Sequence, residues 1–234
     1  MAKREIICSL VGKYRKERIA KKKRDIHILD AGCGMGVLLN GLSRYGNVCG
    51  MDVEEEAVLY CRTISGSGMT ILKGKLPDEV PFPDRAFDII VSADCLEHIE
   101  DDYAALVRMR EMLKDEHSFL LLTVPALMCL WSYNDEFVHH YRRYHKRQFT
   151  RLLQRAGYQV EMCSYYNFWT LPAVWMIRKL KNLFHIKKDD LSYGTKDGWM
   201  NQILTRIFSS EKRRLLHNKT FPAGVSLCVV AVRK

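Results

Sequence analysis

The chain has 234 residues, a length that suits one α/β domain with a sizeable buried core. It is 47% hydrophobic and 27% charged, the balance of an ordinary globular protein. Its longest apolar stretch, residues 168–177, contains a proline and is far shorter than the ~20 residues that span a bilayer, so no transmembrane segment is predicted. The eight cysteines are scattered without a C-x-x-C pair, which predicts reduced thiols and a cytoplasmic protein.

The net charge of +10 is uneven, because residues 1–24 contain ten Lys and Arg against two Glu. Such a segment favours nucleic acid, anionic lipid or an acidic substrate, and it is equally typical of a solvated helix face. Over residues 4–20 one helical face collects five apolar side chains: Ile6, Ile7, Leu10, Val11 and Tyr14. We expect this helix to pack on the domain, with peripheral contact to a membrane as the alternative.

From residue 25 onward, strand-like and helix-like segments alternate, which predicts an α/β fold with a parallel sheet. The predicted strands are 26–31, 47–53, 69–73, 87–93, 118–124, 158–164 and 226–232. The predicted helices are 35–45, 54–63, 101–114 and 146–156. No repeat divides the chain, so one domain is expected, with an aromatic and basic insertion at 167–220 that includes a helix-like run at 198–216. The insertion could cover the active site, dock on a membrane through 167–188, or form a satellite core.

The most informative motif is D-A-G-C-G-M-G at residues 30–36, directly after the first predicted strand. Its glycines let the backbone turn tightly and approach a ligand closely. A dinucleotide fingerprint would need a glycine at position 37, where the chain has Val37. The carboxylate of Asp30 would repel a pyrophosphate and attract an ammonium group. S-Adenosylmethionine (SAM) has an ammonium and no phosphate, so the motif favours SAM.

This motif resembles motif I of the class I SAM-dependent methyltransferases. The resemblance implies an α/β, Rossmann-like fold: a seven-stranded, mostly parallel sheet flanked by helices, with an antiparallel last strand and the helical insertion before it. It implies that Asp30 contacts the ammonium of SAM, while the loop lies against the methionine moiety through Gly32, Cys33, Gly34 and Gly36. The single domain 1–234 then comprises a basic N-terminal helix (1–24), a SAM-binding core (25–166), the insertion or lid (167–220) and a final strand (221–234).

Two acids at later strand ends extend the predicted cofactor site. Asp52 follows Gly32 by 20 residues, the separation that sets an acid beside the ribose of a bound nucleoside, with Val53 next to it. A helix cap is the alternative role for Asp52. Asp94 follows the fourth strand, and the preceding run P-F-P-D-R-A-F-D resembles the family pattern. Lys75 lies where the family often has an acid for the adenine, so the adenine contact stays open.

A hydroxyl acceptor must lose a proton during methyl transfer, so a general base is expected. His98 follows the fourth strand, and His140 lies in the run W-S-Y-N-D-E-F-V-H-H-Y-R-R-Y after the fifth. That run resembles a W-S-x-x-D…H-x-R-R-Y signature of uncharacterised bacterial methyltransferases, and the resemblance implies a small-molecule, lipid or sugar acceptor, as is expected for many of them. The resemblance implies that His140 faces the substrate, while Arg142 and Arg143 pair with acids or bind an anionic substrate. The alternative is that these groups only brace the loop.

Carboxylates and imidazoles near the fourth strand also raise the question of a metal. Asp94, Glu97 and His98, with His139 or His140, could supply ligands. The set resembles that of metal-dependent RNA 2′-O-methyltransferases and of ubiquinone-biosynthesis O-methyltransferases. The run L-E-H-I after the fourth strand is nevertheless frequent in family members without a metal, so none is predicted.

The sequence thus predicts a SAM-dependent methyltransferase that forms S-adenosylhomocysteine and methylates a small-molecule, lipid-like or sugar-like acceptor, at oxygen in preference to nitrogen or carbon. RNA or protein methylation is the second hypothesis, motivated by the pI of about 9.2. Nucleic acid is not the expected partner, because no RNA-binding appendage is recognisable. A non-catalytic SAM binder and an NAD-dependent dehydrogenase are the remaining alternatives.

Overall fold

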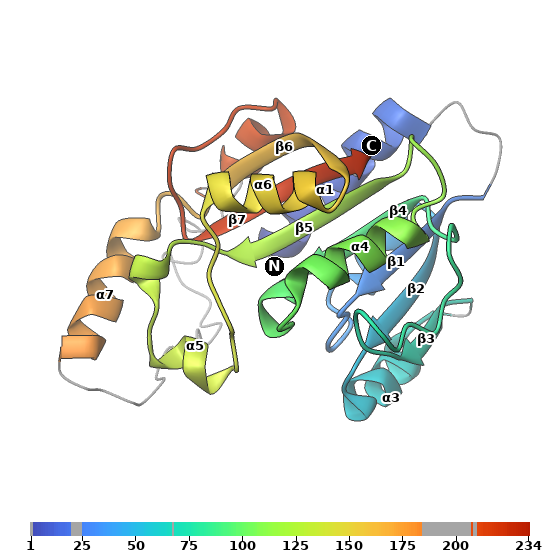
Figure 1. The fold of residues 1–234 in the computed structure, drawn as a ribbon, viewed down its shortest axis with the longest axis horizontal. Coiled ribbons are helices and arrows are strands. Elements are labelled where there is room, and N and C mark those ends of the chain that lie inside the picture. The colour runs from blue at the N-terminus through green and yellow to red at the C-terminus, as the bar shows by residue number, and fades with distance from the viewer. Residues whose placement is uncertain (1, 20–24, 67, 184–206, 208–209) are drawn as a thin grey trace.

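Seven strands form one sheet that runs through the middle of the molecule (Figure 1). The computed structural model describes residues 2–19, 25–66, 68–183, 207 and 210–234. The strands are β1 (His27–Ala31), β2 (Asn47–Asp52), β3 (Thr70–Lys73), β4 (Ile89–Ala93), β5 (Phe119–Pro125), β6 (Tyr158–Tyr166) and β7 (Ser226–Arg233). The seven strands predicted from the sequence are confirmed, with ends that agree within two residues.

The strand order is β3-β2-β1-β4-β5-β7-β6. Strand β7 pairs antiparallel with both β5 and β6, whereas the pairs formed by β1 to β5 are parallel. The chain moves outward from β1 to β3 and then returns to the other side of β1 with β4. Ligands of open α/β sheets bind at the carboxyl ends of the strands where this reversal occurs. The topology therefore marks the ends of β1, β2 and β4 as the place of a site.

The strands are apolar because helices cover both faces of the sheet. Every residue of β5 is buried, as are the six central residues of β7. Continuous apolar runs of this kind are typical of parallel sheets that are covered on both sides. Figure 1 shows α4 and α6 over one face, while α1 crosses the other.

The helices are α1 (Ala2–Tyr14), α2 (Leu39–Leu42), α3 (Glu55–Ile64), α4 (Asp102–Met112), α5 (Tyr133–Phe137), α6 (Lys146–Arg155) and α7 (Leu171–Leu183), with the short turns η1 (Arg15–Ile19), η2 (Leu96–His98) and η3 (Met128–Leu130). The prediction of a helix over 35–45 was wrong in extent. The chain makes turns through residues 35–38, and Gly36 has a φ of +74°, which an α-helix does not accommodate. Regular helix therefore begins only at Leu39.

Helix α1 packs on the domain, as predicted. Its apolar face is part of the hydrophobic core, and each of its members is at most 3% exposed: Ile6, Ile7, Leu10, Val11 and Tyr14. Burial of these side chains leaves them unavailable to a membrane surface. This packing therefore argues against the alternative of membrane contact through the N-terminal helix.

The insertion after β6 contains α7 and a helical segment at residues 210–216. Most of the predicted helix-like run at 198–216 lies outside the described residues, as do residues 184–188 of the predicted membrane-facing stretch. Glu211 joins the two ends of the insertion, because its carboxylate accepts hydrogen bonds from the backbone N–H groups of Asn167, Phe168 and Trp169. None of the helices in the described part of the chain has the length and apolar character that a bilayer crossing requires.

Candidate active site

The glycine motif forms a loop that is fastened to the neighbouring strand. The backbone N–H groups of Gly32 and Cys33 both donate to the carbonyl of Met51 in β2, at 2.8 and 3.0 Å. Gly32 has a φ of +80°, and a Cβ there would lie 2.4 Å from the sulfur of Cys95. Gly34 has a φ of +49°, yet among the described residues no atom beyond its chain neighbours lies within 4 Å of where its Cβ would be. The loop thus packs tightly at Gly32 and is open at Gly34.

Asp52 lies at the end of β2, where it supports this loop. Its Oδ2 accepts a hydrogen bond from the Gly34 N–H at 2.7 Å, and its Oδ1 accepts one from the Glu54 N–H at 3.1 Å. A carboxylate has about four acceptor positions, so two remain for a ribose. The adjacent Val53 is 48% exposed, which leaves an apolar surface beside the carboxylate. These residues suit the nucleoside half of SAM, and Asp52 also has a structural role in the loop.

Asp30 is a buried acid at the end of β1. It is 1% exposed, and within the described residues neither of its oxygens has a hydrogen-bond partner. Burial raises the pKa of Asp30 to about 8, with a further contribution from the charge of Asp52. A cation near this carboxylate would offset the cost of its burial. The unsatisfied acid is therefore a suitable partner for an ammonium group, and its contact with SAM stays a prediction.

Asp94 makes a contact that the sequence did not predict. Its carboxylate pairs with the ammonium of Lys3 in α1, and its other oxygen accepts a hydrogen bond from the Thr123 hydroxyl at 3.0 Å. Burial lowers the pKa of Lys3 to about 8, against the opposing effect of Glu97. Lys3 and Asp94 are 91 residues apart, and no motif in the sequence relates them. The first turn of α1 thus contributes a basic side chain to the carboxyl edge of the sheet.

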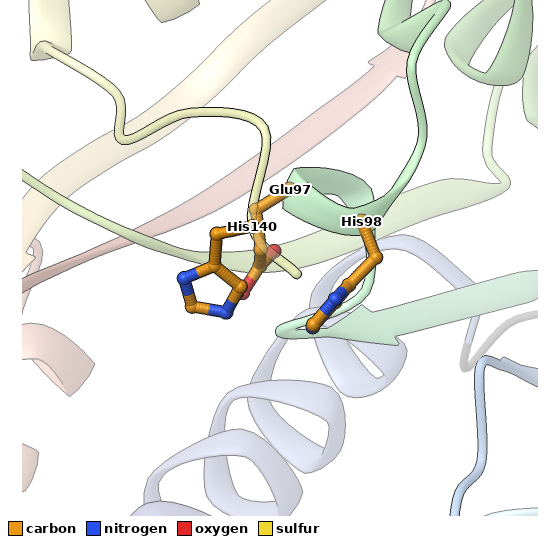
Figure 2. Close-up of side chains that lie close together, drawn as sticks. All are labelled: Glu97, His98 and His140. Atoms are coloured by element: carbon orange, nitrogen blue, oxygen red, sulfur yellow. The ribbon is translucent and has the colours of Figure 1, made fainter. Parts of the chain in front are cut away.

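Glu97, His98 and His140 come together beyond the end of β4 (Figure 2). One carboxylate oxygen of Glu97 and one ring nitrogen of each histidine lie within 4.8 Å of one another. Glu97 and His98 belong to η2, while His140 comes from the segment after α5. The two imidazole rings pack edge to face, with their centroids 4.6 Å apart. Of the predicted site residues, Asp94 and His139 are not part of this group.

Glu97 is the buried member of this cluster. It is fully buried, and within the described residues neither of its carboxylate oxygens has a hydrogen-bond partner. Its Oε1 lies 3.9 Å from Nε2 of His140. Burial raises the pKa of Glu97 to about 7, and burial together with the neighbouring His140 lowers the pKa of His98. Perturbed acids and bases gathered at a strand end are typical of a functional site.

Asp135 orients His140 from the other side. Its Oδ1 lies 3.0 Å from Nδ1 of His140 and 2.7 Å from Nε of Arg143. Its Oδ2 accepts hydrogen bonds from the N–H and the hydroxyl of Ser132, and another from Arg178. Although burial alone would raise it, the hydrogen bonds from His140 and Arg143 hold the pKa of Asp135 well below its usual range. The capping-box pattern from Ser132 to Asp135 was visible in the sequence, but it did not indicate this wider role.

Arg142 and Arg143 pair with acids, which was one of their two predicted roles. Arg142 lies 2.9 Å from a carboxylate oxygen of Asp102 and also donates to the Glu100 carbonyl. Arg143 is 6% exposed, and besides Asp135 it donates to the carbonyl of Ala126 at 3.0 Å. Both guanidinium groups are therefore engaged in the protein, which leaves little capacity for an anionic substrate.

Comparisons with known proteins assign the chain to a family. A family model described as a methyltransferase domain matches residues 4–162. The chain belongs to this family. The assignment agrees with SAM as the cofactor of this methyltransferase domain, and the observed sheet confirms the predicted fold class.

Individual relatives cover shorter stretches. An uncharacterised methyltransferase of Schizosaccharomyces pombe is 32% identical over 105 residues, which cover 40% of this chain and 37% of the relative. A ubiquinone biosynthesis O-methyltransferase of Cereibacter sphaeroides is 30% identical over 92 residues, or 38% of this chain and 37% of the relative. The chain thus spans little more than a third of either relative.

A solved structure is similar over most of the chain. The SAM-dependent methyltransferase of Mesorhizobium loti superposes with a TM-score of 0.60 at 17% identity, covering 89% of this chain and 91% of that one. At this level of identity the similarity concerns the fold. It supports the seven-stranded architecture on which the site residues are placed.

Proposed function

We propose that this domain transfers the methyl group of SAM to a hydroxyl group of a small or lipid-like acceptor, with His140 as the general base. The observation that carries the proposal is the position of His140. Its Nδ1 is bound to the buried Asp135, and its Nε2 is directed toward the cluster with Glu97 at the carboxyl edge of the sheet. An imidazole held by a carboxylate at one nitrogen presents the other as a proton acceptor.

Each site residue has a separate role in the proposed reaction. We assign Asp30 to the ammonium of SAM, Asp52 and Val53 to its nucleoside, and the loop from Gly32 to Gly36 to its methionine moiety. SAM supplies a methyl group on a positively charged sulfur, which makes the carbon electrophilic. The acceptor oxygen forms the new bond to that carbon as the carbon–sulfur bond breaks, and the acceptor proton passes to Nε2 of His140. Glu97, with its pKa near 7, then faces the resulting imidazolium and can stabilise its charge.

The surroundings of the cluster support an apolar acceptor. Large apolar side chains are exposed on η3 and the segment that carries His140, and on α7 and the turn before it, and α7 packs against η3: Met128, Phe137, Tyr141, Trp169, Trp175 and Met176. Exposed apolar side chains at the rim of a site typically bind the apolar part of a ligand. Peripheral membrane contact through α7 is a further proposal on the same surface.

The test is formation of S-adenosylhomocysteine by the purified protein with fractions of small molecules and lipids from a lysate. We expect His140→Ala to lower turnover by about 10²- to 10⁴-fold while the affinity for SAM stays within twofold. His117→Ala, an exposed histidine away from the cluster, is the control. Mass spectrometry of the product identifies the methylated atom. Unchanged turnover of His140→Ala would exclude its role as the base, and SAM binding without any product would favour a non-catalytic binder.

The cluster also favours a second candidate, in which a divalent cation activates the acceptor hydroxyl. One carboxylate and two imidazoles within 4.8 Å are a suitable donor set for such an ion, and Asp135 behind His140 resembles the carboxylate that often orients a metal-bound histidine. Turnover in the presence of EDTA separates the two. Activity that persists and is not raised by added Mg²⁺, Mn²⁺ or Zn²⁺ supports His140 as the base. Activity that EDTA removes and one of these ions restores assigns the cluster to a cation.

A further inference from the structure

Helix α7 of the insertion reaches the residue that orients His140. Arg178 donates from one guanidinium nitrogen to Oδ2 of Asp135 at 3.1 Å and also to the carbonyl of Leu130. Its side chain is 18% exposed, so the contact is largely shielded from water. Leu130 ends η3 and Asp135 lies in α5, so Arg178 joins two successive elements of the segment that carries the proposed base.

Arg178 is much farther from Asp135 along the sequence than the other residues that contact this carboxylate. Ser132, His140 and Arg143 lie within eight residues of Asp135, whereas Arg178 is 43 residues away. Among the described residues it is therefore the one contact through which the insertion holds this carboxylate. Charge-assisted hydrogen bonds of a guanidinium are directional and about twice as strong as neutral ones, so they fix the position of the group they bind.

The position of Asp135 decides what His140 can do. When Nδ1 of the neutral imidazole donates its proton to Asp135, Nε2 carries none and can accept the proton of a hydroxyl. A shift of Oδ1 by about 1 Å would weaken this hydrogen bond and release the ring to its other tautomer or orientation. Misplacement of this size typically reduces turnover by about 10²-fold. A residue that holds Asp135 therefore acts on catalysis through His140.

We propose that Arg178 is a positioning residue, through which docking of α7 on Asp135 keeps His140 in the tautomer and orientation of a general base. The insertion then completes the active site as well as bordering the acceptor. This inference rests on the proposed function of His140, and it adds a dependence of catalysis on a residue outside the cofactor-binding core. Arg178 contacts neither cofactor nor acceptor in this proposal.

The experiment compares Arg178→Ala, His140→Ala and the double variant. We expect Arg178→Ala to lower kcat by about ten- to a hundredfold, with the affinity for SAM within twofold of the unmodified protein. On the His140→Ala background the same substitution should change kcat by less than twofold, because the two residues act as one unit. Arg178→Lys, which keeps the charge and one contact, should recover part of the loss. Lys179→Ala, an exposed cation on the same helix, is the matched control.

A second readout does not need an acceptor. The ring nitrogens of His140 distinguish its tautomers by NMR, and we expect a dominant Nδ1–H form in the unmodified protein and a mixture in Arg178→Ala. Equal losses on both backgrounds, or an unchanged tautomer in Arg178→Ala, would overturn the proposal. If the unmodified protein transfers no methyl group, the proposed function fails, and the NMR comparison still decides whether Arg178 positions His140.

Discussion

Asp52 and Gly34 are joined by a 2.7 Å hydrogen bond from the Gly34 N–H to Oδ2 of the carboxylate. This bond ties the end of β2 to the open part of the glycine loop. The same carboxylate is the proposed ribose contact, so its two roles coincide in one side chain. An acid that shapes the loop and also binds the nucleoside couples the two halves of the cofactor site.

Replacing Asp52 by alanine should therefore weaken SAM binding more than tenfold, because two ribose hydrogen bonds and the support of the loop are lost together. Isothermal calorimetry measures the dissociation constant directly. Glu56→Ala, an exposed acid in the first turn of α3, is the matched control and should bind SAM normally. Near-native affinity of Asp52→Ala would contradict the assignment of this residue.

The raised pKa of Asp30 predicts a pH dependence of the ligand-free protein. The ordinary value is 3.8 and the folded value is about 8, so between these pH values the folded chain holds a proton that the unfolded chain has released. The contribution to stability is thus complete below about pH 4 and is lost as the pH rises through 8. Thermal unfolding should show Tm falling over this window in the unmodified protein and less steeply in Asp30→Asn.

Binding of SAM should displace the proton of Asp30. An ammonium beside the carboxylate favours its ionised form, so at pH 7 the protein should release close to one proton on binding. Calorimetry in two buffers with different ionisation enthalpies measures this number. Asp30→Asn, which has no proton to release, should give the same heat in both buffers. Equal heats for the unmodified protein would show that Asp30 is not the ammonium contact.

Asp135 should dominate the acid sensitivity of the segment after β5. Its folded pKa is depressed, so its contribution to stability is present above the unfolded value of about 4 and is lost as the pH falls through the folded value. Asp135→Ala would leave the guanidiniums of Arg143 and Arg178 without their carboxylate, at a cost of about 3–5 kcal/mol. Urea unfolding at pH 7 tests this value. Asp101→Ala, which removes an exposed helix cap, should cost only about 1 kcal/mol.

Two glycines of the loop should respond differently to alanine. At Gly32 the new Cβ would lie 2.4 Å from the Cys95 sulfur and the φ is +80°, so we expect a loss of more than about 2 kcal/mol in unfolding free energy. At Gly34 the space is open, and the φ of +49° costs a non-glycine residue about 1 kcal/mol. Denaturant unfolding of both variants gives the comparison. A smaller loss for Gly32→Ala than for Gly34→Ala would be inconsistent with this packing.

The central strands could be predicted from the sequence because they are short apolar runs, as in β4 and β5. Burial on both faces makes such runs continuous, as in Leu120 to Leu122 of β5. Helix ends were harder to predict. The positive φ of Gly36 interrupts an otherwise helical pattern, and nothing in the apolar spacing of residues 35–45 marks that interruption.

The partners of the site residues could not be predicted in the same way. The sequence places Asp94 at a strand end and His140 in the segment after β5. It does not indicate that Lys3 pairs with Asp94 across 91 residues, or that Arg178 binds Asp135, the partner of His140, across 43 residues. Such pairs depend on where α1 and α7 pack in the folded chain, which local sequence patterns do not indicate. Charge alone did not select these two side chains among the 37 Lys and Arg of the chain.

The place of β7 in the sheet affects how the chain folds during its synthesis. This strand is synthesised after β5 and β6, yet it lies between them and pairs with both. Until residues 226–233 leave the ribosome, β5 lacks a neighbour along one edge and β6 has no neighbouring strand in the sheet. Unpaired edges of this kind bind other chains readily. The edges of β5 and β6 that pair with β7 therefore stay without their native partner while the insertion is translated, and the last strand pairs with both.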